Sequence, residues 1–282
     1  MDRKDKVLIS INKDGLGLEI GSSHNPLAPK KDGYKVHILD HMSKEELIVK
    51  YKDHSVELEN IEEVDFVWRG ESYTDLTGKS KYYDWIIASH IIEHTPDLIG
   101  FLKDCDSILK NDGVLSLVVP DKRFCFDYYR PITGISKIID CHLQKNRIHT
   151  AGSVAEYFLN VVALNGSISW NSSSTGKYSF IHSIQDARQG ISSVSNDNEY
   201  LDVHAWCFVP HSFRLIIHDL YCLGFIPFQE VNFFSTEGSE FFVTLGRKGH
   251  GIINSRLEFL EIIEAEIKNN LCCSKSSPKS KK

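Results

Sequence analysis

Short apolar segments recur along the first 120 residues, and the first two end in a glycine and an aspartate. The first two are LGLEIG at 16–21 and YKVHILD at 34–40. VDFVW at 64–68, DWIIAS at 84–89 and VLSLVV at 114–119 continue the series without the alternation of a half-exposed strand. Strands buried on both faces need cover on both sides, so this pattern predicts an α/β fold with a mostly parallel sheet.

Helix signals lie between these strands. Ser43 is followed three residues later by Glu46, a capping box that precedes an apolar helix face. Thr95-Pro96 predicts an N-cap and the first position of a helix that ends at 111–113. Only residues 22–33 separate the first two strands, and their prolines leave little room for a crossover helix. Further helices are expected near 134–144, 153–164 and 210–222, and after Gly251.

The second half of the chain is less regular. Residues Gly166 to Asn198 contain ten serines, which predicts a flexible lid or insertion. Strands at about 225–233 and 240–247 are close enough to pair as an antiparallel edge hairpin. We therefore predict a Rossmann-like, doubly wound sheet with that hairpin and a helical or loop insertion on the acceptor side. The predicted single domain is 1–270, with core segments 14–121 and 201–250, an insertion at about 122–200 and a disordered tail at 271–282.

The composition limits the kinds of partner and cellular location expected for this chain. The 32 Lys and Arg residues against 38 Asp and Glu give a net charge of −6, which provides no overall attraction for nucleic acid. The apolar stretch of the N-terminal MDRKDKVLISINKDG is too short for a signal-peptide core or a membrane span, so we expect a cytoplasmic protein. The seven cysteines form no CxxC pair, and we predict reduced thiols and no metal site.

The first strand ends in an acidic residue, an apolar residue and a glycine. Gly21 lets the backbone approach a ligand. Glu19 can either organise the loop or bind the ammonium group of a ligand through water. Asp40 ends the second strand, where a carboxylate can accept both hydroxyls of an adenosine ribose. Ser23 and Pro26 stand where a G-x-G-x-x-G loop would have its later glycines, which disfavours a dinucleotide and its pyrophosphate.

At these residues the chain resembles the class I S-adenosylmethionine (SAM)-dependent methyltransferases. The resemblance implies that Glu19 and Gly21 approach the methionine part of SAM. Gly70-Glu71-Ser72 resembles the family segment that contacts the adenine amino group, which implies that role for Glu71. Residues 83–94, YDWIIASHIIEH, resemble the family's strand followed by an acid-histidine pair, and the similarity covers roughly 16–121. The predicted SAM-binding residues are Glu19, Gly21, Ser22, Ser23, Asp40, Glu71, Ser72 and Ser89.

Beyond residue 121, PDKRFCFDYYRP and HAWCFVPHSF resemble a methyltransferase subgroup associated with surface-glycan biosynthesis. This resemblance implies a small-molecule or glycan acceptor. Open α/β sheets bind substrate beyond the carboxyl ends of their strands, so residues just past the fifth strand are expected to line the acceptor pocket. The predicted acceptor-binding residues are Arg123, Tyr128, Tyr129 and Arg130. The candidates for a base that takes the acceptor proton are His94, Asp121, His204 and, more weakly, His90.

Two other hypotheses remain open from the sequence. A non-catalytic SAM-fold module acting as a partner in a biosynthetic assembly would bind SAM without releasing S-adenosylhomocysteine (SAH). An NAD-dependent sugar-modifying enzyme is disfavoured by the missing phosphate-binding glycines. Each catalytic candidate also has a structural alternative, since a buried histidine or a strand-end aspartate often only packs or caps.

Overall fold

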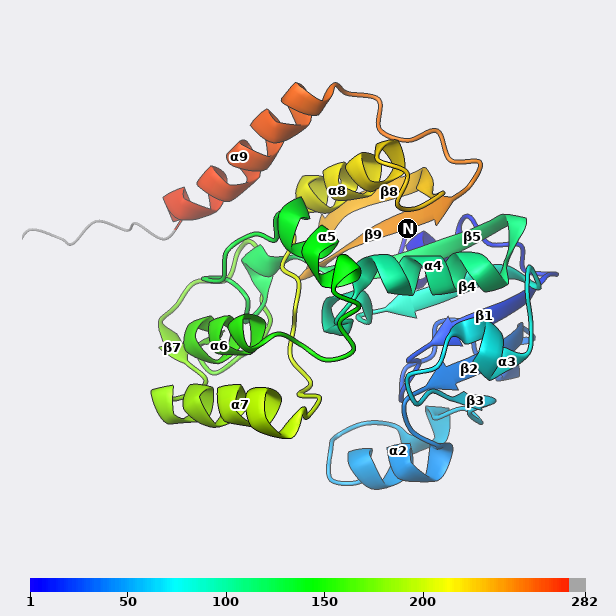
Figure 1. The fold of residues 1–282 in the computed structure, drawn as a ribbon, viewed down its shortest axis with the longest axis horizontal. Coiled ribbons are helices and arrows are strands. Elements are labelled where there is room, and N and C mark those ends of the chain that lie inside the picture. Colours follow the sequence, from blue (N-terminus) through cyan, green and yellow to red (C-terminus); the bar gives the residue numbers. More distant parts are fainter. Residues whose placement is uncertain (274–282) are drawn as a thin grey trace, which may run out of the picture.

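The computed structural model describes residues 1–273, with the backbone alone for 269–273. Its centre is a seven-stranded sheet (Figure 1). Five neighbouring strands are parallel, and the last two form an antiparallel hairpin at one edge, as predicted. In spatial order the strands are β3 (Phe66–Val67), β2 (Lys35–Asp40), β1 (Leu16–Ile20), β4 (Tyr83–Ser89), β5 (Leu109–Pro120), β9 (Glu240–Gly246) and β8 (Gln229–Glu237).

Alternate side chains of β4 pack on opposite faces of the sheet. Ile86 and Ala88 belong to the larger apolar cluster, whereas Trp85 and Ile87 belong to the smaller one. Four helices contribute side chains to the larger cluster, and α4, α5 and α8 lie in front of the sheet in Figure 1. The four are α3 (Tyr73–Thr77), α4 (Leu98–Ile108), α5 (Ile135–Leu143) and α8 (Pro210–Cys222).

The smaller cluster is covered by an N-terminal helix, α1 (Arg3–Leu8), which the sequence analysis did not predict. Val7 and Leu27 pack together in this cluster, and the Ser116 hydroxyl donates a hydrogen bond to the Val7 carbonyl at 2.8 Å. Residues 22–33 contain a single 3-10 turn, Lys30–Asp32, and no crossover helix, as their length predicted. The N-terminal helix therefore covers a face that a crossover helix would otherwise protect.

Residues 122–200 carry elements of their own. They include α6 (Ala151–Asn160), α7 (Ile184–Asp197) and the two-stranded pair β6 (Val162–Leu164) and β7 (Tyr178–Phe180). The serine-rich stretch expected to be a flexible lid thus contains a strand and a helix. The predicted helix at 153–164 ends early, at Asn160, because the chain turns into β6.

Local capping decides where two helices begin. At α2 (Lys44–Tyr51) the capping box is present as predicted, with Ser43 and Glu46 each accepting the other's backbone N–H. At α4 the predicted Thr95 cap is wrong. Asp97 is the N-cap and accepts from the Gly100 N–H at 2.8 Å, so the helix begins two residues beyond Pro96. It ends at Ile108, and β5 starts directly afterwards, earlier than expected.

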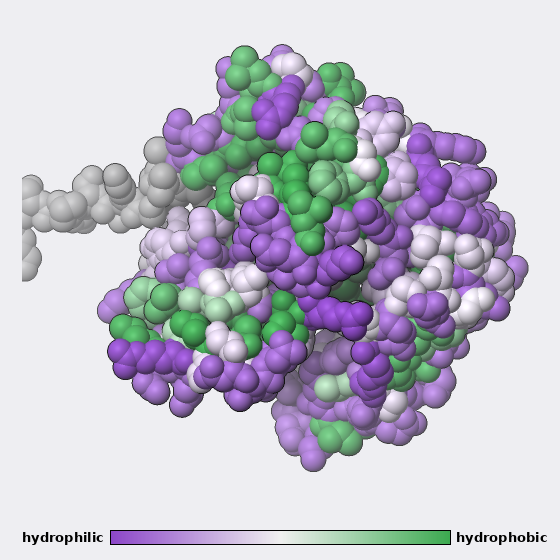
Figure 2. All heavy atoms as spheres, viewed as in Figure 1, coloured by the Kyte–Doolittle hydropathy of each residue, from purple (hydrophilic) through white to green (hydrophobic). Residues whose placement is uncertain are grey.

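The chain closes with α9 (Arg256–Cys273), and most of the predicted tail, 271–282, lies outside the described residues. Apolar residues gather on two parts of the surface in Figure 2, over the α8–α9 region and over the α6–α7 region. Exposed apolar side chains near α6 and α7 include Leu159, Phe180, Ile181 and Ile184. In the described part of the chain, no helix has the length and apolarity that a membrane span requires.

Gly17 of β1 is a position where the sheet tolerates no side chain. A Cβ there would lie 2.2 Å from ring atoms of Trp85, which is fully buried. We expect Gly17→Ala to lower the free energy of unfolding by about 1–3 kcal/mol through overpacking. Urea unfolding followed by circular dichroism measures this change. Gly152→Ala on α6 is the matched control, where stability should stay the same or rise by about 0.5–1 kcal/mol. Equal stabilities of the two variants would contradict this account of the core.

Candidate functional site

Three parallel strands end level with one another. Ile20 of β1 pairs with Leu39 of β2 and with Ala88 of β4, so the next residue of each strand lies at the same edge. The sheet order reverses direction between β1 and β4, the point at which open α/β sheets bind ligands. The structure therefore brings three predicted SAM-binding residues to one edge, namely Gly21, Asp40 and Ser89.

Gly21 has a φ of +66°, a left-handed conformation that favours glycine. Its N–H donates to the Leu39 carbonyl at 2.8 Å. A Cβ on Gly21 would lie 2.2 Å from Cδ1 of Ile91, so the space beside this glycine is filled by a side chain. The immediate reason for glycine is thus its φ and the contact with Ile91.

Asp40 lies next to the turn that carries Glu71. Oδ1 of Asp40 accepts from the His41 N–H and lies 2.7 Å from His41 Nδ1. The Trp68 N–H donates to the Asp40 carbonyl, and Arg69 donates through Nη1 to the His41 carbonyl. Glu71 in turn accepts from the Arg69 N–H at 2.8 Å. The predicted ribose and adenine residues are therefore neighbours, with Asp40 buried and Glu71 partly exposed.

Glu19 holds the loop that follows β1. Its carboxylate is 2% exposed and accepts from the N–H groups of Leu27 at 2.6 Å and Ala28 at 3.0 Å. Burial raises the pKa of Glu19 to about 7, although both amide hydrogen bonds act to lower it. Of the two roles considered for Glu19, the contacts are those of a loop organiser. Ser22 and Ser23 lie in the loop that Glu19 fixes, and Ser23 has a left-handed φ of 50°.

An ion-pair chain ties α1 to the carboxyl end of β4. Arg3 donates through Nη2 to the Ser89 hydroxyl at 3.0 Å and through Nε to Glu240 at 2.6 Å. Glu240 also lies 2.7 Å from His90 Nε2. Burial lowers the pKa of His90, but Glu240 and Glu93 outweigh it and raise the pKa to about 9. His90 therefore carries its proton at neutral pH and is not suited to act as a base.

Two predicted catalytic histidines meet beyond β4. The rings of His94 and His204 are 4.7 Å apart and nearly perpendicular. Nδ1 of His204 lies 2.5 Å from Asp127, and Nδ1 of His94 lies 2.7 Å from Asp202. Each imidazole thus has a carboxylate that orients it. Sequence reasoning missed both aspartates, because each is far along the chain from the histidine it contacts.

The predicted acceptor-binding role of Arg130 requires correction. Its side chain is fully buried, with Nη1 2.7 Å from Asp127 and Nη2 2.9 Å from Glu156. Burial raises the pKa of Asp127, but His204 and Arg130 outweigh it and lower the pKa to about 2. Arg130 therefore holds Asp127 in place instead of lining an open surface. The i, i+3 spacing of the two residues was the available signal in the sequence.

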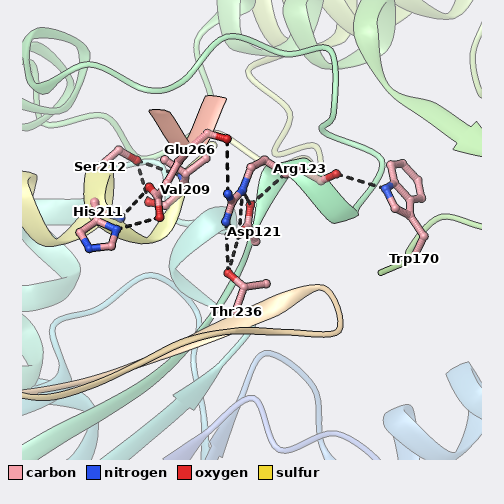
Figure 3. Close-up of polar contacts among 8 residues, drawn as sticks. All are labelled: Asp121, Arg123, Trp170, Val209, His211, Ser212, Thr236 and Glu266. Carbon is pink, nitrogen blue, oxygen red and sulfur yellow. Dashed lines mark hydrogen bonds and ion pairs between the residues drawn. The ribbon is translucent and has the colours of Figure 1, made fainter. Parts of the chain in front are cut away.

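The carboxylate of Asp121 also has a structural role, as a hydrogen-bond acceptor for neighbouring side chains (Figure 3). It is fully buried, accepts from Arg123 Nε at 2.9 Å and accepts from the Thr236 hydroxyl at 2.6 Å. With these donors on its oxygens, Asp121 is not positioned as a free base. Arg123 itself lines a cavity of about 270 Å³ beyond β5. The other lining residues are Phe124, Asn171, Ser172, Pro210, Ser235, Thr236, Gly238 and Glu266.

The two predicted acceptor tyrosines belong to an aromatic group and are not among the residues that line this cavity. Tyr128 stacks on Tyr178 at 4.9 Å with an 18° angle between the rings. Tyr129 meets Tyr128 edge-on and is 55% exposed. Trp170 lies 6.1 Å from Tyr128 and donates through Nε1 to the Arg123 carbonyl. The aromatic group is therefore linked to the backbone of the cavity wall.

The residues at the β2–β1–β4 edge fit the adenosyl part of SAM. A strand-end carboxylate lies level with a glycine, and a second carboxylate follows in the adjacent turn. Both carboxylates are hydrogen-bond acceptors, which suit the donating hydroxyls of a ribose and the donating amino group of an adenine. Together with the strand order, it defines a class I SAM-dependent methyltransferase.

The chain belongs to the methyltransferase domain family, whose model matches residues 3–162. The predicted enzyme class, and SAM as the cofactor of that class, are thereby confirmed. No curated protein matches the sequence.

Solved structures with a similar fold are distant in sequence. One is a SAM-dependent methyltransferase from Aquifex aeolicus, with 17% identity, 43% of this chain and 65% of that chain covered, and a TM-score of 0.32. A second is the trans-methyltransferase CalH in complex with SAH, with 14% identity, 85% and 53% covered, and a TM-score of 0.40. A third is a SAM-dependent methyltransferase from Methanosarcina mazei, with 14% identity, 84% and 94% covered, and a TM-score of 0.41. The chain thus spans less than two thirds of the first two.

The raised pKa of Glu19 predicts a pH effect on stability. The folded protein holds this proton up to about pH 7, whereas the unfolded chain releases it near 4.5, so stability falls as the pH rises between these values. Relative to Glu19→Gln, the wild type should lose about 2–3 kcal/mol across that window. Urea unfolding at several pH values measures the difference. Parallel pH profiles for the two proteins would show that Glu19 ionises normally.

Proposed function

We propose that this chain transfers the methyl group of SAM to a small polar acceptor, with a sugar or glycan precursor as the favoured class. The observation that carries the proposal is the level placement of Gly21, Asp40 and Ser89 at the sheet edge of a methyltransferase-family chain. SAM bound there supplies a methyl group on a good leaving group. The protein then has mainly to bind SAM, to orient the acceptor and to exclude water.

On the cofactor side, Asp40 accepts the ribose hydroxyls and Glu71 contacts the adenine. Glu19 keeps the loop with Ser22 and Ser23 in shape through two buried amide hydrogen bonds. Ser72 caps α3 with its hydroxyl and so fixes the turn after Glu71. These residues divide into those that contact SAM and those that hold the contacting segments.

On the acceptor side, we assign the cavity beyond β5. Its wall carries the guanidinium of Arg123, the carboxylate of Glu266 and the hydroxyls of Ser235 and Thr236, groups that hydrogen-bond a polyhydroxylated molecule. The exposed ring of Tyr129, in the adjacent aromatic group, offers a flat apolar face for the C–H side of a sugar ring. The net charge of −6 also suits a small acceptor better than a nucleic acid.

The acceptor hydroxyl must lose a proton as its oxygen gains the methyl group. His94 and His204 are the proposed residues that act on this hydroxyl, because each ring is oriented by a carboxylate and His94 is one-third exposed. Asp121, with its oxygens taken by Arg123 and Thr236, is no longer proposed for this step.

One observation favours the non-catalytic alternative, a SAM-fold module in a biosynthetic assembly. Ile91 fills the space that a side chain on Gly21 would take, so one part of the cofactor edge is already occupied. The assay that separates the two hypotheses incubates the protein with SAM and pools of sugars, nucleotide sugars and glycan intermediates. The proposed enzyme releases SAH and adds one CH₂ unit to the mass of an acceptor. A protein that binds SAM but methylates no member of these pools would support the alternative.

Asp40 provides the sharpest test of the cofactor site. Asp40→Asn should weaken SAM binding by about 1–3 kcal/mol, because charge-assisted hydrogen bonds to the ribose are lost. Isothermal titration calorimetry measures this affinity. Asp112→Asn, an exposed carboxylate of β5, is the matched control and should leave the affinity unchanged. If a folded Asp40→Asn protein bound SAM as the wild type does, Asp40 would not belong to the site.

A further inference from the structure

Glu93 is a buried carboxylate whose oxygens lack hydrogen bonds. It lies in the 3-10 turn Ile92–His94 that follows β4, and its side chain is 0% exposed. Neither oxygen has a hydrogen-bond partner among the described residues. His90 Nδ1 lies 3.3 Å from one oxygen and supplies charge on that side only. Burying a carboxylate in this way costs several kcal/mol, so a second cation close to Glu93 would stabilise the fold.

Two imidazoles converge on the same point. Glu93, His94 and His204 each offer one ligand atom, and these atoms lie within 4.8 Å of one another. Metal–ligand bonds of about 2.0–2.2 Å place neighbouring ligands roughly 3–4 Å apart, so a small inward movement of the three side chains would close the site. The two histidines are far apart in the sequence, one after β4 and one shortly before α8.

An outer carboxylate orients one of the two rings in the way metal sites require. Asp127 contacts His204 Nδ1 at 2.5 Å, which leaves Nε2 of His204 as its ligand atom, and Asp202 lies 2.7 Å from His94 Nδ1 as an ion-pair partner. Arg130 fixes the other oxygen of Asp127 at 2.7 Å. Carboxylate–histidine pairs of this kind set the tautomer and the direction of metal-binding rings.

We propose that Glu93, His94 and His204 bind one divalent transition-metal ion, such as Zn²⁺. Two imidazoles and one carboxylate suit zinc or iron better than magnesium or calcium. Three protein ligands also leave a position open for a hydroxyl group, as in catalytic zinc sites. With the metal bound, His94 and His204 would act on the acceptor hydroxyl as metal ligands and not as bases, because a metal ion would lower the pKa of a hydroxyl group at the open position and so serve the proposed O-methylation. Metal binding itself does not depend on that function being correct.

This inference departs from the sequence-based prediction of no metal site. The spacing of His90 and His94, four residues apart, was a signal available in the sequence. The structure uses His94 differently, since its partners in the cluster are the adjacent Glu93 and the distant His204. His90 instead forms ion pairs with Glu240 and Glu93.

The test uses the full-length protein after dialysis against a chelator. Zn²⁺ is titrated in competition with a chromogenic chelator, and Co²⁺ is added to a second sample for its visible absorption. We expect one tightly bound Zn²⁺ ion per chain. Co²⁺ should show absorption bands typical of a low coordination number with nitrogen and oxygen ligands. Zn²⁺ should also raise the thermal midpoint of the wild type.

Three variants locate the site. Glu93→Gln and His204→Gln should each weaken Zn²⁺ binding at least tenfold. Asp127→Asn removes the carboxylate that orients His204, together with the charge that faces Arg130, and should weaken binding by roughly 10–100-fold. His218→Gln is the matched control, because His218 Nε2 and Cys222 Sγ lie 3.5 Å apart on α8 and form a separate pair that could bind zinc adventitiously. This variant should bind Zn²⁺ as the wild type does.

Three results would overturn the proposal: no Zn²⁺ bound by the wild type, equal binding by folded Glu93→Gln, or loss of binding in His218→Gln alone. Thermal unfolding without metal reports whether each variant folds, and Glu93→Gln removes a buried charge, so its fold should survive. His94→Gln, at a partly exposed position, provides a second ligand variant. If Zn²⁺ fails to bind while methyl transfer persists, only this inference falls, and the converse result removes the proposed function instead.

Discussion

The parallel pairing of β1 with β2 and β4 is the constraint on which the site depends. Because hydrogen bonding fixes the register of both pairs, the residues after Ile20, Leu39 and Ala88 must emerge at one edge of the sheet. The apolar segments of these strands then bury both faces and leave only their carboxyl ends for polar chemistry. The position of the proposed cofactor site therefore follows from backbone pairing, before any side chain is considered.

Buried and partly buried ion pairs attach the remaining segments to this edge. Arg3 joins α1 to Glu240 at the start of β9, Arg123 joins Asp121 to the β8–β9 hairpin, and Arg130 joins Asp127 to α6 through Glu156. A pair of this kind adds little net stability, because both charges lose water, but removing one partner leaves a costly buried charge. Their value to the fold is positional, since each sets how a segment outside the parallel strands meets the site.

Much of the fold could be predicted from local signals, whereas much of the site could not. The range of α8, the capping box at Ser43 and the edge hairpin all follow from residues close together in sequence. The failures involve competition or distance. Asp97, and not Thr95, caps α4. The carboxylate of Asp121 accepts a hydrogen bond from the distant Thr236 and is not free to act as a base. Asp40 and Gly21 could be placed because strand ends carry their own pattern, but no local pattern indicates that His204 meets Glu93.

The segment 90–94 is where the two halves of the site meet. Ile91 lies against Gly21 at the cofactor edge, and the next three residues form the 3-10 turn that carries Glu93 and His94. His90 begins the segment in a left-handed conformation, a strain that ordinary turns avoid and that its two carboxylate contacts hold in place. The segment 90–94 therefore carries both the side chain that contacts Gly21 and two of the three proposed metal ligands. A backbone movement at Gly21 or at the ligands is constrained by the other.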